Sequence, residues 1–149
     1  MAACYNGVLI SKIRGGVVVT IIVYEEPFAI CRLASGEHVP SWCTDSAFLS
    51  VSRSPDELSI VCLQHLIPRG VQCSRDWTLM RIDGVLDLQL TGVLSGLLVP
   101  LSSAGVNVFT MSTFDTDYIM VPRSKLELAR TSLRVDGHRI VERKISPEA

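Results

Sequence analysis

The sequence predicts an α+β fold, and two observations carry that prediction. The first is the order of local patterns from Trp77 to Val121: an extended run, an amphipathic helix, and two more extended runs around a short polar tip. This order is typical of the front of a split βαβ unit. The second is an internal repeat at an offset of 60 residues, which indicates two copies of one small supersecondary unit.

The composition indicates a folded chain with no special affinity for phosphate. The 149 residues suit one domain or two small ones, and 48% of them are hydrophobic, which is enough to bury a sizeable core. The net charge of -1 offers no basic excess, so we expect no nucleic-acid partner. The apolar run at 16–24 is too short for a membrane helix, which needs about 20 residues, and no signal-peptide cleavage site follows it. We therefore expect a cytoplasmic protein with no membrane partner.

The cysteines and histidines show no metal-binding spacing. The five cysteines are an odd number without a CxxC pair, and Cys31 and Cys62 lie inside apolar runs. This pattern favours buried free thiols in a reducing compartment. His38, His65 and His138 lie far apart, so we predict no metal site and no cofactor.

The first half reads as a series of extended runs. Residues 1–15 have no clear period and are predicted as a disordered tail. Glu25-Glu26-Pro27 is predicted to end the first strand, and Ser54-Pro55-Asp56 has turn chemistry, because Pro fixes φ and Asp bonds to its own backbone. A short helix is expected at 64–68. The predicted strands of this half are residues 16–24, 28–33, 48–52 and 58–62.

The second half contains two amphipathic helices. Between residues 90 and 101 the leucines follow a helical period with one buried face, and Gly105 is a plausible stop that accepts positive φ. Pro122 is well placed in the first turn of the next helix, in which Leu126, Ala129 and Leu133 form the apolar stripe. Asp136-Gly137 is predicted to end it. The predicted strands of this half are residues 78–82, 106–111, 118–121 and 138–141.

The repeat sets the predicted domain boundaries. Residues 48–52 align with 108–112, and residues 58–61 align with 118–121, with apolar residues matching at most positions. We therefore predict a first unit at 16–75 and a second at 76–145.

Four runs resemble a known family. They are FAICRL at 28–33, SVSRSPDELSIV at 50–61, LTGVL at 90–94 and STFDTDY at 112–118. The chain resembles small bacterial proteins made of two tandem ACT units, related to the cytosolic arginine sensors of animal cells and to the regulatory half of aspartokinases. The resemblance covers roughly 17–141. Ser54 stands where Thr is usual, and Phe114 where Tyr is common.

The resemblance implies two ferredoxin-like βαββαβ units with antiparallel sheets and helices on one face, the first unit partly degenerate because its first helix is short or missing. It also implies a non-catalytic regulatory protein that binds a small effector, most often an amino acid, at an interface between units. A homodimer and a regulated protein partner are expected. In the animal sensors the effector sits against the glycine-containing start of a helix and a Thr-Phe-x-x-Asp tip, which correspond here to Gly92 and to Thr113, Phe114 and Asp117.

The chemistry of these residues suits a zwitterion. A helix N-terminus offers N–H groups and a partial positive charge to a carboxylate, and Gly92, between Thr91 and Val93, would let a ligand approach that backbone closely. Asp117 would accept from the ammonium, Thr113 would add a hydroxyl and Phe114 a wall. Arg53 and Ser54, on the matching tip of the first unit, are candidates for facing the same ligand.

Each candidate also has a purely structural explanation. Gly92 would equally allow tight helix–sheet packing, and Thr91 would be an ordinary N-cap. Asp115 and Asp117 would form Asx-turns at a hairpin tip, and Phe114 would be core.

Two other functional classes remain open at the level of sequence. One is a protein-interaction module that uses its sheet edges and has no small ligand. The other is a small enzyme, but GxSxG, Walker A and GxGxxG motifs are absent, and the segment at 92–96 has Leu94 where GxSxG needs Ser. Asp115 and Asp117 have no evident nucleophile or metal partner, so we predict that the protein is not an enzyme.

Overall fold

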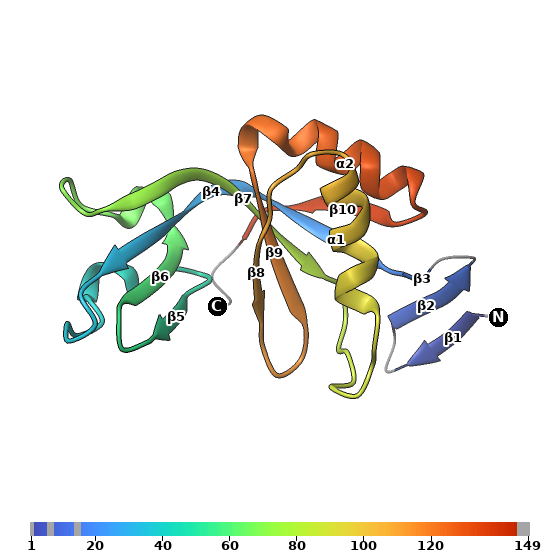
Figure 1. Cartoon of the computed structure of the whole chain (residues 1–149), viewed down its shortest axis with the longest axis horizontal. Helices are drawn as coiled ribbons and strands as arrows, with labels where there is room; N and C mark the ends of the chain where they lie inside the picture. The colour runs from blue at the N-terminus through green and yellow to red at the C-terminus, as the bar shows by residue number, and fades with distance from the viewer. Residues whose placement is uncertain (1, 6–7, 14–15, 146–149) are drawn as a thin grey trace.

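The structure is a computed structural model that describes residues 2–5, 8–13 and 16–145. Within these ranges the fold is mixed α/β, with a seven-stranded sheet (Figure 1). Six of its strands follow the order β5-β6-β4-β7-β9-β8, and the seventh, β10, pairs with β4. A separate three-stranded sheet has the order β1-β2-β3. The main-sheet strands are β4 (Thr20–Leu33), β5 (Ser50–Arg53), β6 (Leu58–Leu63), β7 (Cys73–Ile82), β8 (Phe109–Ser112), β9 (Asp117–Pro122) and β10 (Arg139–Arg143).

Strand β4 is the long central element, and it corrects one prediction. The sequence predicts a break at Glu25-Glu26-Pro27, but β4 continues through these residues with a register shift against β7. The segment 20–24 pairs with β10, whereas 28–33 pairs with β6. The three residues lie between the stretch of β4 that pairs with β10 and the stretch that pairs with β6, and Pro27 keeps Thr78 of β7 as its partner on the other edge.

Strand β7 is also longer than predicted. It begins at Cys73 rather than Thr78, and its antiparallel pairing with β4 extends from Ile21 to Cys31. Its first residues are polar and exposed, so their side chains show no alternating apolar pattern. Each of the two long strands therefore belongs to both halves of the sheet.

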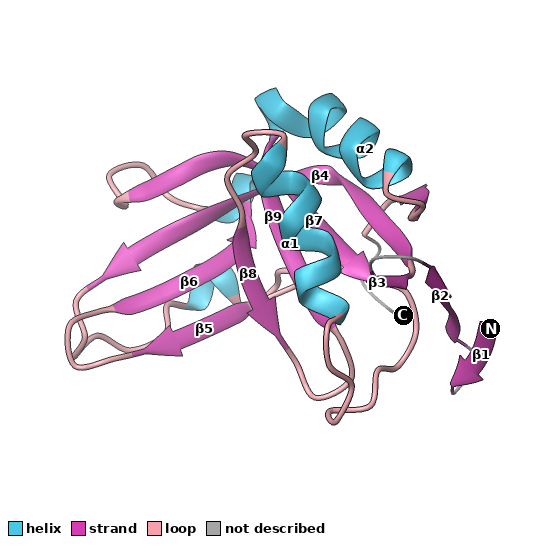
Figure 2. Ribbon diagram, turned by 45° about the vertical axis from the view of Figure 1, so that its right-hand side comes forward, coloured by secondary structure: helices cyan, strands magenta, loops and turns pink. Residues whose placement is uncertain are grey.

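The two helices of the second half confirm the amphipathic patterns. Helix α1 (Val93–Ser103) buries Leu97 and Leu101 completely, and α2 (Leu126–Val135) buries Ala129 and Leu133. All four side chains share one core cluster, so both helices cover the same face of the sheet (Figure 2). Strand β9 lies between β7 and β8, so β7, α1 and β8 form the predicted split βαβ arrangement.

The last strand departs from a simple βαββαβ unit. In such a unit the final strand pairs with the first. Here β4 lies between β7 and β10, pairing with β7 antiparallel and with β10 in parallel. A strand from the first half of the chain is thereby inserted into the second half.

The first half has 3-10 turns where helices are expected. Strands β4 and β5 are joined by a segment with the turn η1 (Ser41–Cys43), and β6 and β7 by one with η2 (Gln64–Leu66). In the second half η3 (Arg123–Lys125) precedes α2. The strand order β7-β4-β6-β5 is nevertheless that of a βαββαβ unit. A short or missing first helix is what the sequence predicts.

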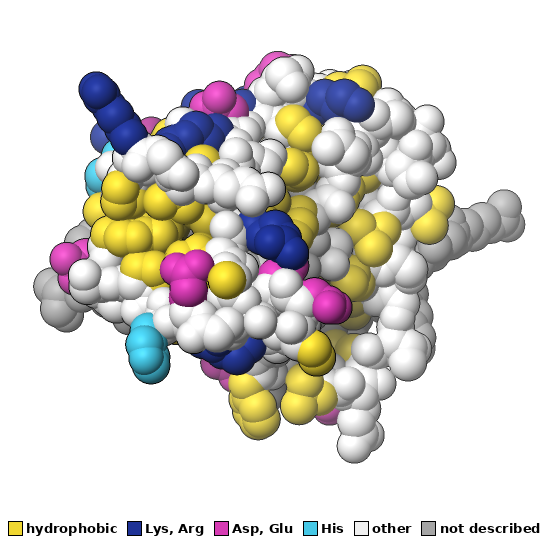
Figure 3. Space-filling view, turned by 60° about the vertical axis from the view of Figure 1, so that its left-hand side comes forward, with side chains coloured by type: hydrophobic (Ala, Val, Ile, Leu, Met, Phe, Trp, Pro, Cys, Tyr) yellow, Lys and Arg dark blue, Asp and Glu magenta, His cyan; other side chains and the backbone are white. Residues whose placement is uncertain are grey.

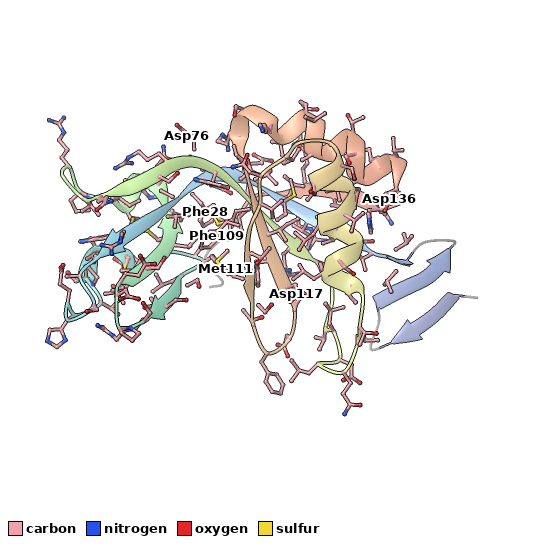
Figure 4. The ribbon with its side chains drawn as sticks, in the orientation of Figure 1. Phe28, Asp76, Phe109, Met111, Asp117 and Asp136 are labelled. Carbon is pink, nitrogen blue, oxygen red and sulfur yellow. The ribbon has the colours of Figure 1, made fainter. Side chains whose placement is uncertain are left out.

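The opposite face of the sheet has its own apolar cluster. Phe28, Leu79 and Met120 are buried there, and Phe109 and Met111 of β8 pack against them. Figure 4 shows Phe28, Phe109 and Met111 gathered together. The ring centroids of Phe48, which precedes β5, and Tyr118 of β9 are 4.6 Å apart. This contact joins the segment before β5 to β9 at the edge of the cluster.

The N-terminal segment is predicted to be disordered, but its described residues form strands. Strands β1 (Ala2–Tyr5), β2 (Val8–Ile13) and β3 (Gly16–Val18) form antiparallel pairs. Such pairing uses backbone groups, so it requires no side-chain periodicity that the sequence would reveal. Residues 1, 6–7, 14–15 and 146–149 lie outside the described ranges. The predicted boundaries at 75 and 76 stay predictions.

On the face shown in Figure 3, basic and acidic side chains are interspersed around exposed apolar ones, and neither sign of charge forms a patch of its own. No helix in the described part of the chain is long and apolar enough to cross a membrane.

Candidate functional site

A hollow of about 390 Å³ opens beside the start of α1. Three segments form it: the loop that leads from β7 into α1, the first turn of α1, and the tip between β8 and β9. Figure 4 shows Asp117, the first residue of β9, near the start of α1. The lining residues are Leu86, Asp87, Leu88, Leu90, Gly92, Val93, Leu94, Ser95, Ser112, Thr113, Phe114, Asp115, Thr116 and Asp117.

The first turn of α1 reaches the hollow without a side-chain cap. The N-cap residue is Gly92, with no side-chain hydrogen bond to the turn, and the turn contains no acidic residue. The Ser95 hydroxyl donates to the Gly92 carbonyl, 3.1 Å away, and so is directed at an acceptor of the turn. The N–H groups at this end therefore carry the partial positive charge of the helix terminus without a side-chain cap or an acidic residue of the first turn.

Backbone conformation is the reason for glycine at position 92. Its φ is +83°, in the left-handed region that favours glycine. A Cβ added there would lie 3.9 Å from the Ser95 hydroxyl, which is ordinary contact. Tight helix–sheet packing is therefore not what requires this glycine. The alternative role of Thr91 as N-cap is wrong, because the left-handed Gly92 occupies that position.

The β8–β9 tip is a closed turn held by two threonines. The Thr113 N–H and hydroxyl both donate to the Thr116 carbonyl, at 2.9 and 3.0 Å, and the Thr113 hydroxyl accepts from the Thr116 N–H. The buried Thr116 hydroxyl donates to the Ile82 carbonyl at 2.9 Å, which joins the tip to the end of β7. The Thr113 hydroxyl is thus engaged within the turn, whereas the sequence analysis expects it to contact the ligand.

The tip is also tied to the loop before α1. The Leu86 N–H donates to the Asp115 carbonyl at 2.7 Å. Phe114, at the outermost point of the tip, is 81% exposed and lies on the rim of the hollow, so its explanation as core is wrong. These bonds fix the loop and the tip relative to one another, which keeps the mouth of the hollow in shape.

The electrostatic character of the lining is acidic. Asp87, Asp115 and Asp117 line the hollow, and its lining includes no Lys, Arg or His. The Ser112 hydroxyl donates to Asp117 Oδ1 at 2.6 Å across the hairpin, which orients that carboxylate. This bond differs from the Asx-turn that was the purely structural explanation for Asp117. Asp87 does form such a turn, because its Oδ1 accepts from the Gln89 N–H at 2.9 Å.

The structure brings together most of the predicted site but not all of it. Gly92, Val93, Thr113, Phe114 and Asp117 line the hollow. Val93 is only 4% exposed and belongs mainly to the core. Thr91 does not line the hollow, although it precedes a residue that does.

Arg53 and Ser54 lie elsewhere and serve the loops of the first half. The Arg53 guanidinium donates to the Ser35 and Glu37 carbonyls. The Ser54 hydroxyl accepts from the N–H groups of Asp56 and Glu57, both at 3.2 Å. Neither residue lines the hollow, so the expectation that they face the same ligand fails within this chain.

Sequence reasoning missed the loop before α1. Leu86, Asp87 and Leu88 line the hollow, and the sequence analysis assigns them no role. The signal that could have found them is their position, since a loop entering a helix lies beside that helix's N-terminus. Ser95 and Ser112 were missed because single serines are common on exposed surfaces.

Comparisons with known proteins place the chain in a family. A model described as an ACT domain matches residues 72–135, and a second model, described as an N-terminal domain, matches residues 26–70. The chain belongs to the ACT-domain proteins. No curated protein matches it at a significant level.

Solved structures agree with that assignment. Protein Atu0741 from Agobacterium tumefaciens is 32% identical, with a TM-score of 0.80 over 85% of this chain and 94% of that one. Aspartate kinase from Clostridium acetobutylicum has a TM-score of 0.59 at 14% identity, over 84% of this chain and 36% of that one. The regulatory subunit of aspartate kinase from Thermus thermophilus has a TM-score of 0.58 at 10% identity, over 80% and 99%. The two kinase likenesses concern the fold alone.

Proposed function

We propose that this protein is a non-catalytic regulatory protein that binds an amino acid in the hollow beside α1. The observation that carries the proposal is the meeting of an uncapped helix N-terminus with the Asp117 carboxylate around one hollow. The structurally similar aspartate kinase from Clostridium acetobutylicum is described as an allosteric enzyme, and the similar chain from Thermus thermophilus is the regulatory subunit of an aspartate kinase, so a regulatory role suits this fold.

The two charged groups of an amino acid match the two ends of the hollow. The effector carboxylate accepts from the N–H groups of the first turn of α1, where Gly92 presents no side chain. The effector ammonium donates to Asp117, which Ser112 holds in place. Asp87 and Asp115 add negative charge to the lining, so they favour a neutral or basic effector side chain over an acidic one.

The proposed architecture is two ACT-like units that share β4 and β7, assembled as a homodimer. The strand orders of the two halves support two units, although 3-10 turns replace the helices of the first. The hollow is open, and exposed apolar side chains border it: Phe114 is 81% and Leu88 71% exposed. A unit of a second copy placed over these side chains would complete the interface at which ACT units bind effectors.

The test is a thermal-shift screen of the purified protein against the twenty amino acids. An effector at about 100 times its dissociation constant stabilises the folded state by roughly 2.7 kcal/mol. For a chain of this size that raises the unfolding midpoint by about 5–10 °C. The proposal fails if no amino acid moves the midpoint.

A second candidate function is a protein-interaction module without a small ligand. The observation that favours it is a group of exposed apolar side chains, because Val85, Leu88 and Phe114 line one open hollow on the surface and such groups mark interaction sites. Serine substitution of Leu88 and Phe114 separates the two functions. The interaction module is favoured if no amino acid shifts the unfolding midpoint and the serine variant no longer binds a protein partner that the parent binds.

A further inference from the structure

A group of thiols lies in the first half of the sheet, away from the hollow. Cys31, Cys43 and Cys62 are buried, Cys73 is partly exposed, and all four are free. They belong to one apolar cluster beneath the segment that contains η1. Within the described part of the chain, no group of three or more metal-ligating side chains could hold a metal ion, so a metal does not explain this cluster.

Strand register places Cys31 and Cys73 directly opposite one another. They are Cα partners in the antiparallel pair of β4 and β7, so their side chains project from the same face. The Arg32 N–H donates to the Gln72 carbonyl at 2.9 Å, which makes the next pair along the ladder a hydrogen-bonded one.

The Cys31–Cys73 pair is therefore a non-hydrogen-bonded pair. Such pairs have Cα atoms about 4.5 Å apart and the closer side chains of the two types. This separation falls inside the range of roughly 4.4–6.8 Å that a disulfide bridges.

A third thiol on the same face, that of Cys62, favours reaction at Cys31. Cys62 is opposite Ala29, two residues before Cys31, so it projects from the same face. The neighbouring Cys62 thiol lowers the pKa of Cys31 below its ordinary value, with smaller contributions from Arg75 and Cys73, against burial, which raises it. The proximity of Cys31 and burial both raise the pKa of Cys62.

We propose that Cys31 and Cys73 form a reversible disulfide by exchange with a low-molecular-weight disulfide of the oxidised-glutathione type. The partly exposed Cys73 attacks one sulfur of the small disulfide, loses its proton to water, and releases the first small thiol. The Cys31 thiolate then attacks the Cys73 sulfur of the mixed disulfide and releases the second small thiol. Two protein thiols are oxidised, and one small disulfide is reduced to two thiols.

The bridge would join β4 and β7 at the N-terminal end of β7, where Cys73 lies. It would hold together the part of the sheet that 3-10 turns cover in place of helices. This thiol site does not depend on the proposed effector hollow, so the failure of either proposal leaves the other standing.

Tryptic mapping tests the assignment directly, because each of these four cysteines falls on a different tryptic peptide. The folded protein is incubated with oxidised glutathione, free thiols are alkylated, and the digest is analysed by mass spectrometry without reduction. We expect peptides 15–32 and 70–75 joined with the loss of two hydrogen atoms, at least tenfold more abundant than any other cross-linked pair. Dithiothreitol should restore both free peptides.

Matched variants make the test decisive. Cys62→Ala and Cys43→Ala should retain the 15–32 to 70–75 link, whereas Cys73→Ser should abolish it. The proposal is overturned if unmodified protein yields no linked peptide. It is also overturned if peptide 15–32 is joined instead to 54–69, which contains Cys62.

Discussion

Gly92→Ala tests the helix terminus of the proposed site with the smallest possible change. Because φ at this position is +83°, an alanine there costs roughly 1–2 kcal/mol of backbone strain. The less flexible unfolded chain recovers about 0.4–1 kcal/mol of that. The net loss of about 1 kcal/mol lowers the unfolding midpoint by about 2–4 °C, so the variant stays folded.

Gly70→Ala is the matched control. Gly70 has φ of +88°, and a Cβ there meets nothing within 4 Å, so the backbone strain is of the same kind. Gly70 does not line the hollow. The two variants should therefore lose similar stability and differ only at the site.

The assay is thermal unfolding with and without the amino acid that the screen identifies. The parent and Gly70→Ala should both gain about 5–10 °C at an effector concentration near 100 times the dissociation constant. Gly92→Ala should lose most of that gain, because its Cβ projects over the first turn of α1 toward Ser95. An undiminished gain in Gly92→Ala would refute the placement of the effector carboxylate at this helix terminus.

Three further predictions follow from individual contacts. Asp117→Asn should weaken effector binding about 10–100-fold in isothermal titration, because a charge-assisted hydrogen bond contributes roughly 1.5–3 kcal/mol; unchanged affinity would remove Asp117 from the site. Leu97→Ala, in the fully buried stripe of α1, should lower the free energy of unfolding in urea by about 2–5 kcal/mol, whereas Leu128→Ala, at 48% exposure, should lower it far less; equal losses would contradict the described core. Thr116→Val leaves the Ile82 carbonyl without its donor and should cost about 1–3 kcal/mol, measured by the same urea titration; a neutral result would mean that this bond does not hold the tip.

The sequence predicts the second half of the fold well because periodicity decides it. The stripes of α1 and α2 contain large apolar residues at helical spacing, and only burial on one face explains them. Gly105 and Gly137, at φ of +72° and +92°, follow the two helices as their sequence positions suggest.

The first half is less predictable because tertiary pairing overrides local signals there. Glu25-Glu26-Pro27 has the composition of a break, yet β4 passes through it because its neighbour on one side changes at that point. The insertion of β4 between β7 and β10 is likewise invisible locally, since it depends on which distant strands meet.

The candidate site was predictable in its location and less so in its detail. A glycine entering a helix and an acidic tip are visible as residue types, and the structure places both around one hollow. The engagement of the Thr113 hydroxyl within its own turn depends on the conformation of the tip. Arg53 and Ser54 are site candidates only because the first unit aligns with the second. That alignment gives no information about where the two tips lie in space.

The most direct test of the central claim is an amide chemical-shift map of the ¹⁵N-labelled protein titrated with the amino acid from the screen. We predict that the N–H resonances of Val93, Leu94 and Ser95 shift together with those of the tip at 112–117, at one common dissociation constant. Shifts confined to one of these two segments, or located on other strands, would contradict an effector held between the helix terminus and the acidic tip.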